Sequence, residues 1–267
     1  MTLPRVLADL HGAAESVWQA VATRLPGFAV EVLPTIDSTN SELMRRAHTG
    51  VADPVLLVAA EQTAGRGRRG RGWVSEPGAS LTFSLGLPLN PADWSGLSLA
   101  VGVSLAESLD PAVQLKWPND LWWEDRKLGG ILVETANVGS QRYAIIGVGL
   151  NVVAPATVNP AAGTDGVLPV APAGLSDLPS ASLATAGACL SRVIPPLVED
   201  MFDFERDGFG TFLSRFQARD ALRGRPVRLS DGQTGIADGL RPDGALWISQ
   251  SQGRLAVIQH EVSVRLC

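Results

Sequence analysis

The stretch GRGRRGRGW, residues Gly65–Trp73, gathers four arginines, four glycines and a tryptophan into nine residues. Glycines allow the backbone to approach a ligand closely, and guanidinium groups offer paired donors to phosphate or carboxylate oxygens. The surrounding chain of 267 residues is acidic, with a formal net charge of -5, so the cationic loop is a local feature. The sequence therefore predicts a loop that becomes ordered over an anion of high charge density, such as a triphosphate or a carboxylate being activated beside one.

Three alternative roles for this loop fit its surroundings less well. Disordered Arg-Gly segments bind RNA, but this stretch is short and lies between two predicted strands. No G-x-x-x-x-G-K-[ST] phosphate-binding loop occurs in the sequence. Gly65, Gly67 and Gly70 match a G-x-G-x-x-G spacing, but Pro77-Gly78 interrupts the helix that a dinucleotide-binding fold requires.

The composition argues against several broad classes of protein. Apolar residues make up 45% of the chain and charged residues 18%, which favours a large core over global disorder. The modest negative charge argues against nucleic acid as the main partner. Cys189 and Cys267 are the two cysteines, so we expect a cytoplasmic protein with neither a disulfide framework nor a zinc site. No signal peptide and no apolar run of membrane-spanning length is visible.

Helices and strands are mixed along the first 152 residues. Apolar residues at helical spacing predict helices over residues 15–25, 41–50 and 97–109. Strands are predicted within residues 28–40, 54–62, 80–88, 113–118, 126–136 and 142–152, with a hairpin turn at 137–140. These elements indicate an α+β fold, with a mixed or antiparallel sheet that carries its helices on one side.

A different pattern begins at residue 155. Five prolines from Pro155 to Pro179 predict a long irregular connection, and helices are predicted over residues 182–205 and 208–221. Beyond Arg223-Gly224, turns at SDG, PDG and SQG separate short strands, as in a small β-barrel of about 45 residues. We therefore expect two domains, residues 1–221 and residues 222–267.

Two segments place charged groups close together. KWPND (Lys116–Asp120) sets a cation and a carboxylate around a rigid proline at the end of a predicted strand. RKLGGIL (Arg126–Leu132) sets two cations before a pair of glycines. Lys116 as a surface charge and Asp120 as the cap of a turn are the alternatives to a functional role.

A third segment, IIGVGLN (Ile145–Asn151), has glycines at alternate strand positions. Gly147 and Gly149 would leave one face of the strand bare, so that a flat apolar ligand could lie against the backbone. Close packing of a helix on the sheet would explain the same two glycines.

Four segments, in this order, resemble the biotin protein ligase family, the biotin–[acetyl-CoA-carboxylase] ligases. They are DSTN (Asp37–Asn40), EQTAGRGRRGRGW (Glu61–Trp73), KWPNDL with RKLGGILVE (116–134), and GVGLNV (Gly147–Val152). The resemblance is strong over residues 30–153 and holds only in outline beyond them. It implies a catalytic domain like that of class II aminoacyl-tRNA synthetases and lipoate ligases, followed by a small SH3-like β-barrel.

The resemblance also implies a reaction in two steps. ATP and biotin give biotinyl-5′-AMP and pyrophosphate, and a lysine of a biotin carboxyl carrier domain then displaces AMP. Mg²⁺ is expected to accompany ATP, although no dedicated metal-binding cluster is visible. Two alternatives stay open: a lipoate ligase or transferase of the same fold and, in a different class, an RNA-binding or regulatory protein that uses the arginines.

By the same resemblance, the expected catalytic residues are Arg66, Lys127 and Asp120. Arg66, Arg68 and Lys127 would offset the repulsion between two anions in a dry site. Asp120 would orient the ammonium group of the carrier lysine and accept or relay its proton. The expected biotin-binding residues are Ser38, Thr39, Asn40, Gln62, Gly65, Arg66, Gly67, Arg68, Lys127, Gly130, Ile131, Gly147 and Gly149. The expected adenylate- and ATP-binding residues are Arg66, Arg68, Arg69, Trp73, Lys127 and Asn151.

The expected partner is the carrier domain of a biotin-dependent carboxylase. Only about 35 residues precede Asp37, short of the roughly 60 in a helix-turn-helix domain, so we expect no DNA binding and no repressor activity. We expect no membrane partner, and an exposed sheet edge would allow a homodimer.

Overall fold

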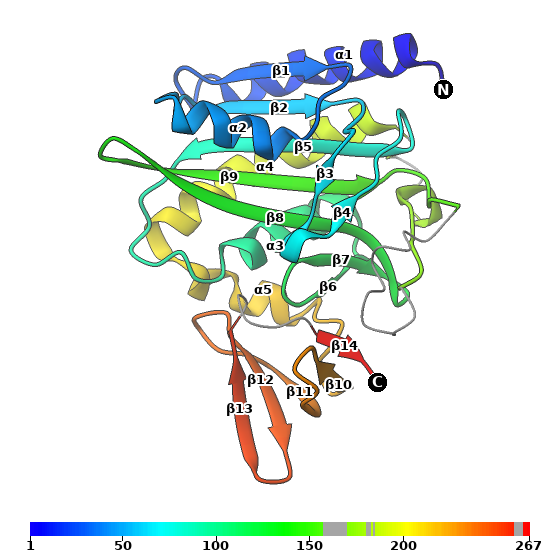
Figure 1. Ribbon diagram of the computed structural model, residues 1–267, viewed down its shortest axis with the longest axis vertical. Helices are drawn as coiled ribbons and strands as arrows, with labels where there is room; N and C mark the ends of the chain where they lie inside the picture. Colours follow the sequence, from blue (N-terminus) through cyan, green and yellow to red (C-terminus); the bar gives the residue numbers. More distant parts are fainter. Residues whose placement is uncertain (157–169, 180–182, 184, 259–263) are drawn as a thin grey trace.

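A seven-stranded mixed sheet forms the centre of the structure (Figure 1). The computed structural model describes residues 1–156, 170–179, 183, 185–258 and 264–267. Within them, β1 and β2 pair in parallel, and the other neighbouring strands of this sheet are antiparallel. The strands, in spatial order, are β1 (Ala29–Leu33), β2 (Val55–Ala59), β5 (Ser80–Pro88), β9 (Gln141–Asn151), β8 (Arg126–Val138), β7 (Asp120–Trp123) and β6 (Gln114–Lys116).

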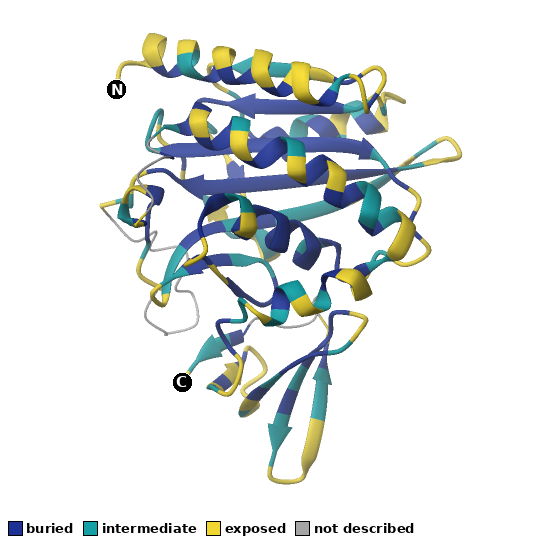
Figure 2. Ribbon diagram, turned by 180° about the vertical axis from the view of Figure 1, so that it is seen from behind, coloured by how far each residue is buried: buried dark blue, intermediate teal, exposed yellow. Residues whose placement is uncertain are grey.

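Helices cover both faces of this sheet (Figures 1 and 2). Leu56 and Val58 of β2 belong to the large core on one face, whereas Leu57 belongs to a second core on the other. Because neighbouring strand residues point to opposite faces, a strand that is apolar throughout needs a helix on each side. The prediction of helices on one side only is therefore wrong. The large core is formed with α1 (Leu3–Val21), α3 (Leu97–Leu109) and α4 (Ala186–Asp207), and the second core with α2 (Thr39–His48).

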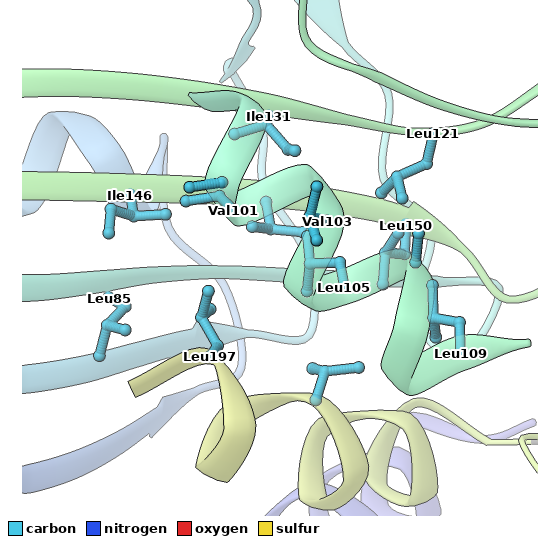
Figure 3. Packing of buried hydrophobic residues seen from close by; sticks show 14 of the residues in the cluster. Leu85, Val101, Val103, Leu105, Leu109, Leu121, Ile131, Ile146, Leu150 and Leu197 are labelled. Atoms are coloured by element: carbon cyan, nitrogen blue, oxygen red, sulfur yellow. The ribbon is translucent and has the colours of Figure 1, made fainter. Parts of the chain in front are cut away.

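Helix α3 is apolar nearly all round and is buried between the sheet and α4. Figure 3 shows Val101, Val103 and Leu105 of this helix among side chains that include Ile146 of β9 and Leu197 of α4. A helix with no polar face is stable only inside a core. Strand β9 therefore has a fixed apolar support behind it, on the face opposite α2.

Three elements differ from the sequence prediction. Helix α1 begins at Leu3 instead of residue 15, because Val6 and Leu10 continue the buried stripe that faces α4. The helix expected over residues 208–221 is divided into a 3-10 turn, Phe209–Phe212, and a short helix, α5 (Leu213–Gln217). Strand β7 was not expected, and it forms because the chain turns back at residues 117–119 and again at 124–125.

A second, antiparallel sheet follows α5. Its hairpins turn at the predicted SDG, PDG and SQG motifs. Trp117 Nε1 donates a hydrogen bond to the Gly244 carbonyl at 3.0 Å, and Arg225 pairs with Asp125 at 2.5 Å, so this sheet contacts the large one directly. In spatial order its strands are β13 (Gly253–Val257), β12 (Leu246–Gln250), β11 (Thr234–Leu240), β10 (Pro226–Leu229) and β14 (Val264–Leu266).

The α+β fold with a C-terminal β-sheet is thus confirmed, while the division into domains at residue 221 stays a prediction. Residues 157–169 of the predicted connection, and residues 182 and 184 of the helix predicted over residues 182–205, lie outside the described residues. No helix in the described ranges is long and apolar enough to cross a membrane.

Candidate active site

A cavity of about 360 Å³ lies on the face of the large sheet that also carries α2. The arginine loop, Gly65–Trp73, lines one side of it. This loop forms a two-stranded ribbon, in which β3 (Gly65–Arg66) pairs with β4 (Gly72–Trp73) around a tight turn. Figure 1 shows β3 and β4 crossing in front of β8 and β9. The cavity therefore lies between the sheet and the arginine loop.

A polar corner of the cavity is formed by Ser38, Thr39 and Asn40 at the N-terminus of α2 and by Gln62, and Ser84 of β5 is hydrogen-bonded to it without lining the cavity. Gln62 Oε1 accepts hydrogen bonds from the backbone N–H and the hydroxyl group of Thr39, at 2.7 and 3.1 Å. The Ser84 hydroxyl lies 2.7 Å from Thr39 Oγ1 and 2.6 Å from Asn40 Oδ1. Ser38, Thr39, Asn40 and Ser84 are buried, so this network holds their polar groups in fixed directions.

The two glycines of β9 face occupied space. A Cβ added to Gly147 would overlap the Asn40 side chain, and one added to Gly149 would overlap the Trp73 ring. The open strand face that was expected above these glycines is therefore occupied by the side chains of Asn40 and Trp73. Gly147 admits α2 against the sheet, which is the alternative that the sequence left open, and Gly149 admits the end of the arginine loop.

An ion cluster of Lys116, Asp120 and Lys127 lies on the neighbouring strands. Lys116 ends β6, Asp120 begins β7 directly opposite it, and Lys127 follows on β8. Lys127 Nζ donates a hydrogen bond to Asp120 Oδ1 at 2.7 Å, while Lys116 Nζ lies 3.9 Å from Asp120 Oδ2. Lys116 is only 8% exposed, so the suggestion that it is a surface charge is wrong. Two hairpin turns bring these three residues together.

The cluster changes the acid–base properties of its members. Burial lowers the pKa of the Lys116 ammonium to about 8, against the opposing effect of the nearby Asp120 carboxylate. Burial also disfavours the charged form of Asp120, but the ammonium groups of Lys127 and Lys116 outweigh it and hold the pKa of Asp120 below its ordinary value. Asp120 therefore stays ionised, and Lys116 titrates close to neutral pH.

The arginine loop is attached to the sheet at two points. Arg66 pairs with Glu134 of β8 at 2.9 Å, and Arg68 Nη1 donates a hydrogen bond to Asn119 Oδ1 at 3.2 Å. Trp73 Nε1 is buried and has no hydrogen-bond partner among the described residues. An indole N–H without an acceptor is costly in a buried position, which makes it a donor available to a ligand.

Nearly all the residues predicted from the sequence line this one cavity. Gly65 is the exception: it borders a second, open hollow of about 620 Å³ on the other side of the loop. Those that line the cavity are Ser38, Thr39, Asn40, Gln62, Arg66, Gly67, Arg68, Arg69, Trp73, Asp120, Lys127, Gly130, Ile131, Gly147, Gly149 and Asn151.

The cavity also contains residues to which the sequence gave no role. Lys116 and Asn119 belong to the KWPND motif, and their position in that motif was a usable signal. Arg265 of β14 reaches the cavity from the C-terminal sheet, and Arg69 Nη1 donates a hydrogen bond to Ser230 Oγ of that sheet at 3.1 Å. No local pattern identifies Arg265, because its contribution depends on how the two sheets pack. Among the described residues, no group of three or more His, Cys, Asp or Glu side chains is arranged to hold a metal ion.

Comparison with known proteins gives a consistent result. The model of the biotin/lipoate A/B protein ligase family matches residues 32–151. The bifunctional ligase/repressor BirA of Escherichia coli (strain K12) is 38% identical over 237 residues, which cover 85% of this chain and 71% of that protein. The biotin–[acetyl-CoA-carboxylase] ligase of Mycobacterium tuberculosis (strain ATCC 25618 / H37Rv) is 41% identical over 143 residues, covering 49% of this chain and 52% of that one.

Solved structures agree with these relatives. The biotin protein ligase from Aquifex aeolicus in complex with biotin and ATP superposes with a TM-score of 0.72 at 26% identity, covering 89% of this chain and 99% of that one. The fold is also shared with the biotin acetyl coenzyme A carboxylase synthetase from Helicobacter pylori, at a TM-score of 0.56 and 22% identity, over 88% of this chain and 99% of that chain.

Proposed function

Because the chain belongs to the biotin/lipoate A/B protein ligase family, we propose that it is an ATP-dependent biotin ligase. It activates biotin as biotinyl-5′-AMP and then transfers the biotinyl group to a lysine of a biotin carboxyl carrier domain. The observation that supports this most directly is the cavity, in which two lysines and several arginines surround a space beside a fixed polar corner. A relative that carries the name biotin–[acetyl-CoA-carboxylase] ligase covers 86% of the chain.

Activation is required because a carboxylate is a poor acyl donor. Its negative charge repels nucleophiles, and oxide is a bad leaving group. Adenylation removes the charge and installs AMP as the leaving group, but two anions must first be brought together. Fixed cations in a water-poor site lower the free energy of that encounter. Lys127, Arg66 and Arg68 are proposed for this role because all three line the cavity.

Lys127 is the proposed contact for the biotin carboxylate and later for the oxygens of the adenylate. Its hydrogen bond to Asp120 holds its ammonium group at the floor of the cavity. The guanidinium groups of Arg66 and Arg68 offer paired donors to phosphate oxygens from the opposite wall. Arg66 would have to exchange its ion pair with Glu134 for the ligand, so substrate binding and loop position are coupled in this proposal.

The biotin ring is proposed to lie near the polar corner. A ureido group needs both donors and acceptors, which Ser38, Thr39 and Gln62 supply. Gly130 and Ile131 are proposed to border the path of the valeryl chain. Other contacts are proposed for Asn40, Gly65, Gly67, Gly147 and Gly149 on the biotin side, and for Arg69, Trp73 and Asn151 on the adenylate side.

In the second step, Asp120 is proposed to orient the ammonium group of the carrier lysine. A carboxylate that stays ionised is well suited to attract a cation, and Asp120 lines the cavity. We also propose that Mg²⁺ enters with the triphosphate, since oxygen ligands of phosphate suit this ion. The carrier domain is proposed to belong to a biotin-dependent carboxylase.

The test is to incubate the protein with ATP, Mg²⁺, biotin and a biotin carboxyl carrier domain, and to weigh the carrier by mass spectrometry. The carrier should gain one biotinyl group, and lipoate in place of biotin should leave it unchanged. Lys127→Met should abolish the gain, whereas Arg228→Met, which removes an exposed cation of β10, should retain it. A wild-type protein that leaves the carrier unmodified, or attaches lipoate instead, contradicts the proposal.

A further inference from the structure

The chain uses lysine at only two positions. Of its 22 Lys and Arg residues, 20 are arginine, and the two lysines are Lys116 and Lys127. Both line the same cavity, and both face the Asp120 carboxylate. Arginine stays protonated at every accessible pH, whereas a buried lysine can lose its proton. The one chemical property that distinguishes these two cations from the rest is therefore confined to the site.

The two lysines are held differently. Lys127 Nζ has a hydrogen bond to Asp120 at 2.7 Å, and its side chain is 34% exposed. The Lys116 side chain is 9% exposed, and its ammonium group lies 3.9 Å from Asp120, beyond hydrogen-bonding distance. Its other close neighbour is the Trp122 ring, with 5.0 Å from Nζ to the ring centroid. Lys116 is thus a buried amine at the cavity wall, and its charge is stabilised by Asp120 without a hydrogen bond and by the Trp122 ring.

Four charged residues near Lys116 influence whether its amine is protonated. Asp120 of β7 favours the ammonium form, while Lys127 of β8, Arg265 of β14 and Arg71 of the arginine loop oppose it. Burial is the largest influence and also opposes the charged form. A single carboxylate therefore faces a desolvated amine and three other cations.

The transfer step needs a proton acceptor. A carrier lysine with an ordinary pKa of about 10.4 is almost fully protonated at neutral pH and cannot attack an acyl adenylate. Asp120 is a weak acceptor for that proton, because the surrounding ammonium groups keep its carboxyl ionised. The acid–base group best suited to proton transfer has a pKa near the working pH.

We propose that the uncharged amine of Lys116, and not the Asp120 carboxylate, accepts the proton from the incoming carrier lysine. This assignment rests on the proposed ligase function and adds a catalytic residue to its second step. Asp120 holds the carrier ammonium beside the cavity wall, and Lys116 takes the proton from it. The pKa of Lys116 near 8 leaves roughly one tenth of it uncharged at pH 7, which is sufficient for a general base.

The proposed transfer conserves every proton and electron pair. One N–H bond of the carrier ammonium breaks, and a new N–H bond forms on Lys116, which becomes an ammonium. The freed lone pair forms a C–N bond to the biotinyl carbonyl carbon, and the C–O bond to phosphate breaks, so that AMP leaves with the electron pair. The second proton of the attacking nitrogen passes to solvent as the amide forms, and Lys116 returns its proton to solvent before the next turnover.

The decisive experiment compares two nucleophiles on preformed biotinyl-5′-AMP bound to the enzyme. The carrier domain must be deprotonated before it attacks, whereas hydroxylamine is already uncharged at neutral pH. Lys116→Arg keeps the positive charge and the approximate length of the side chain but removes the proton acceptor. We expect the ratio of the carrier rate to the hydroxylamine rate at pH 7 to fall by at least about 100-fold in this variant, the usual scale of general-base catalysis.

One result with this variant would overturn the assignment. An unchanged ratio means that the proton goes elsewhere, and this includes the case in which both rates fall together because Lys116 binds the adenylate. If Lys116→Arg no longer binds the adenylate, the pH dependence of the wild type decides. If the wild type does not biotinylate the carrier at all, it is instead the proposed function that fails.

A second measurement needs no variant. With Lys116 as the base, the wild-type ratio should rise with pH and level off above about pH 8. Without such a base, the ratio follows deprotonation of the carrier lysine itself and continues to rise toward about pH 10.4. A continued rise in the wild type would reject Lys116 independently of how well the variant folds.

Discussion

Lys127 Nζ donates a 2.7 Å hydrogen bond to Asp120 Oδ1 across the paired strands β7 and β8. The residue proposed to bind the acyl phosphate and the residue proposed to receive the carrier are therefore in direct contact. A substitution of either residue removes a hydrogen bond from the other. The two steps of the reaction can still be separated, because each substitution should affect them unequally.

Asp120→Asn tests that separation. The amide keeps the shape of the side chain but loses the charge that would attract the carrier ammonium. We expect biotin-dependent exchange between ATP and pyrophosphate to persist, while transfer to the carrier slows by on the order of 10–100-fold, as expected for a lost charge-assisted contact. Rapid-quench measurement of both steps gives the two rates. Transfer at the wild-type rate would remove Asp120 from the second step.

Arg68→Gly should release the adenylate. Arg68 is half-buried in the cavity wall and is held by Asn119, so its guanidinium is positioned toward the ligand. Loss of one charge-assisted hydrogen-bonding group should raise the dissociation rate of biotinyl-5′-AMP by on the order of 10–100-fold. Arg24→Gly, which breaks an exposed ion pair with Glu199, is the control and should leave that rate unchanged. Equal retention by both variants would argue against closure of the loop over the intermediate.

Gly147→Ala should displace Asn40 and so alter the polar corner of the cavity. The added Cβ overlaps the Asn40 amide, so α2 or Asn40 must shift. We expect the free energy of unfolding to fall by about 1–3 kcal/mol, and the KM for biotin to rise. Gly12→Ala is a matched control in α1, where a Cβ meets nothing within 4 Å and helix propensity favours alanine by up to about 1 kcal/mol. Chemical denaturation of both variants distinguishes crowding from a general effect of alanine; equal stability changes would contradict it.

Lys116→Met should change how stability depends on pH. Between about pH 8 and 10.5 the unfolded chain keeps a proton on this lysine that the folded chain has lost, so the free energy of unfolding increases with pH there. The buried ammonium therefore costs stability at pH 7, by an amount on the order of 3 kcal/mol. Lys116→Met should be more stable than wild type at pH 7, with the difference shrinking toward pH 10.5. A constant difference across this interval, in denaturation at several pH values, would contradict the lowered pKa.

Arg265→Met should weaken nucleotide use, although it lies in the second sheet. Arg265 lines the cavity and adds positive charge beside Lys116. We expect the KM for ATP to rise by about 10-fold, on the scale of one lost charge-assisted contact, with little change in the KM for biotin. Arg228→Met is a matched control, because Arg228 is the cross-strand neighbour of Arg265 but is exposed. Equal KM values for the two variants would exclude the second sheet from the site.

The elements predicted best from the sequence are those whose ends are set by residues adjacent to them in the chain. Strand β5 and helix α3 begin and end at the predicted residues, because Pro and Gly flank an apolar run that no other element alters. Helix α1 was placed too late, although its buried stripe already begins with Val6 and Leu10 and continues to Val21. The motifs meet at one cavity, because strands β6 to β9 pair side by side and α2 and the arginine loop lie against them.

Properties that depend on tertiary packing could not be predicted. Lys116 is buried because β6 and β7 pair and the Trp122 ring lies near its ammonium group. No residue adjacent to Lys116 in the sequence predicts this burial. The contact of Asn40 with Gly147 joins segments that are distant in sequence. Arg265 enters the site only through the docking of one sheet on another. Sequence motifs thus predicted most of the residues that line the cavity, while the electrostatic state of each group required the folded chain.

Strand β9 presents Gly147, Gly149 and Asn151 to the cavity, whereas Ile146, directly before Gly147, and Leu150, directly before Asn151, belong to the large core. Neighbouring residues of one strand thus serve different properties: those on one face shape the cavity, and those on the other face contribute to thermal stability. Substitutions that improve core packing at Ile146 or Leu150 would also shift the backbone of Gly147 and Asn151 next to them. Variants selected for thermal stability at these positions should therefore be assayed for activity from the first round.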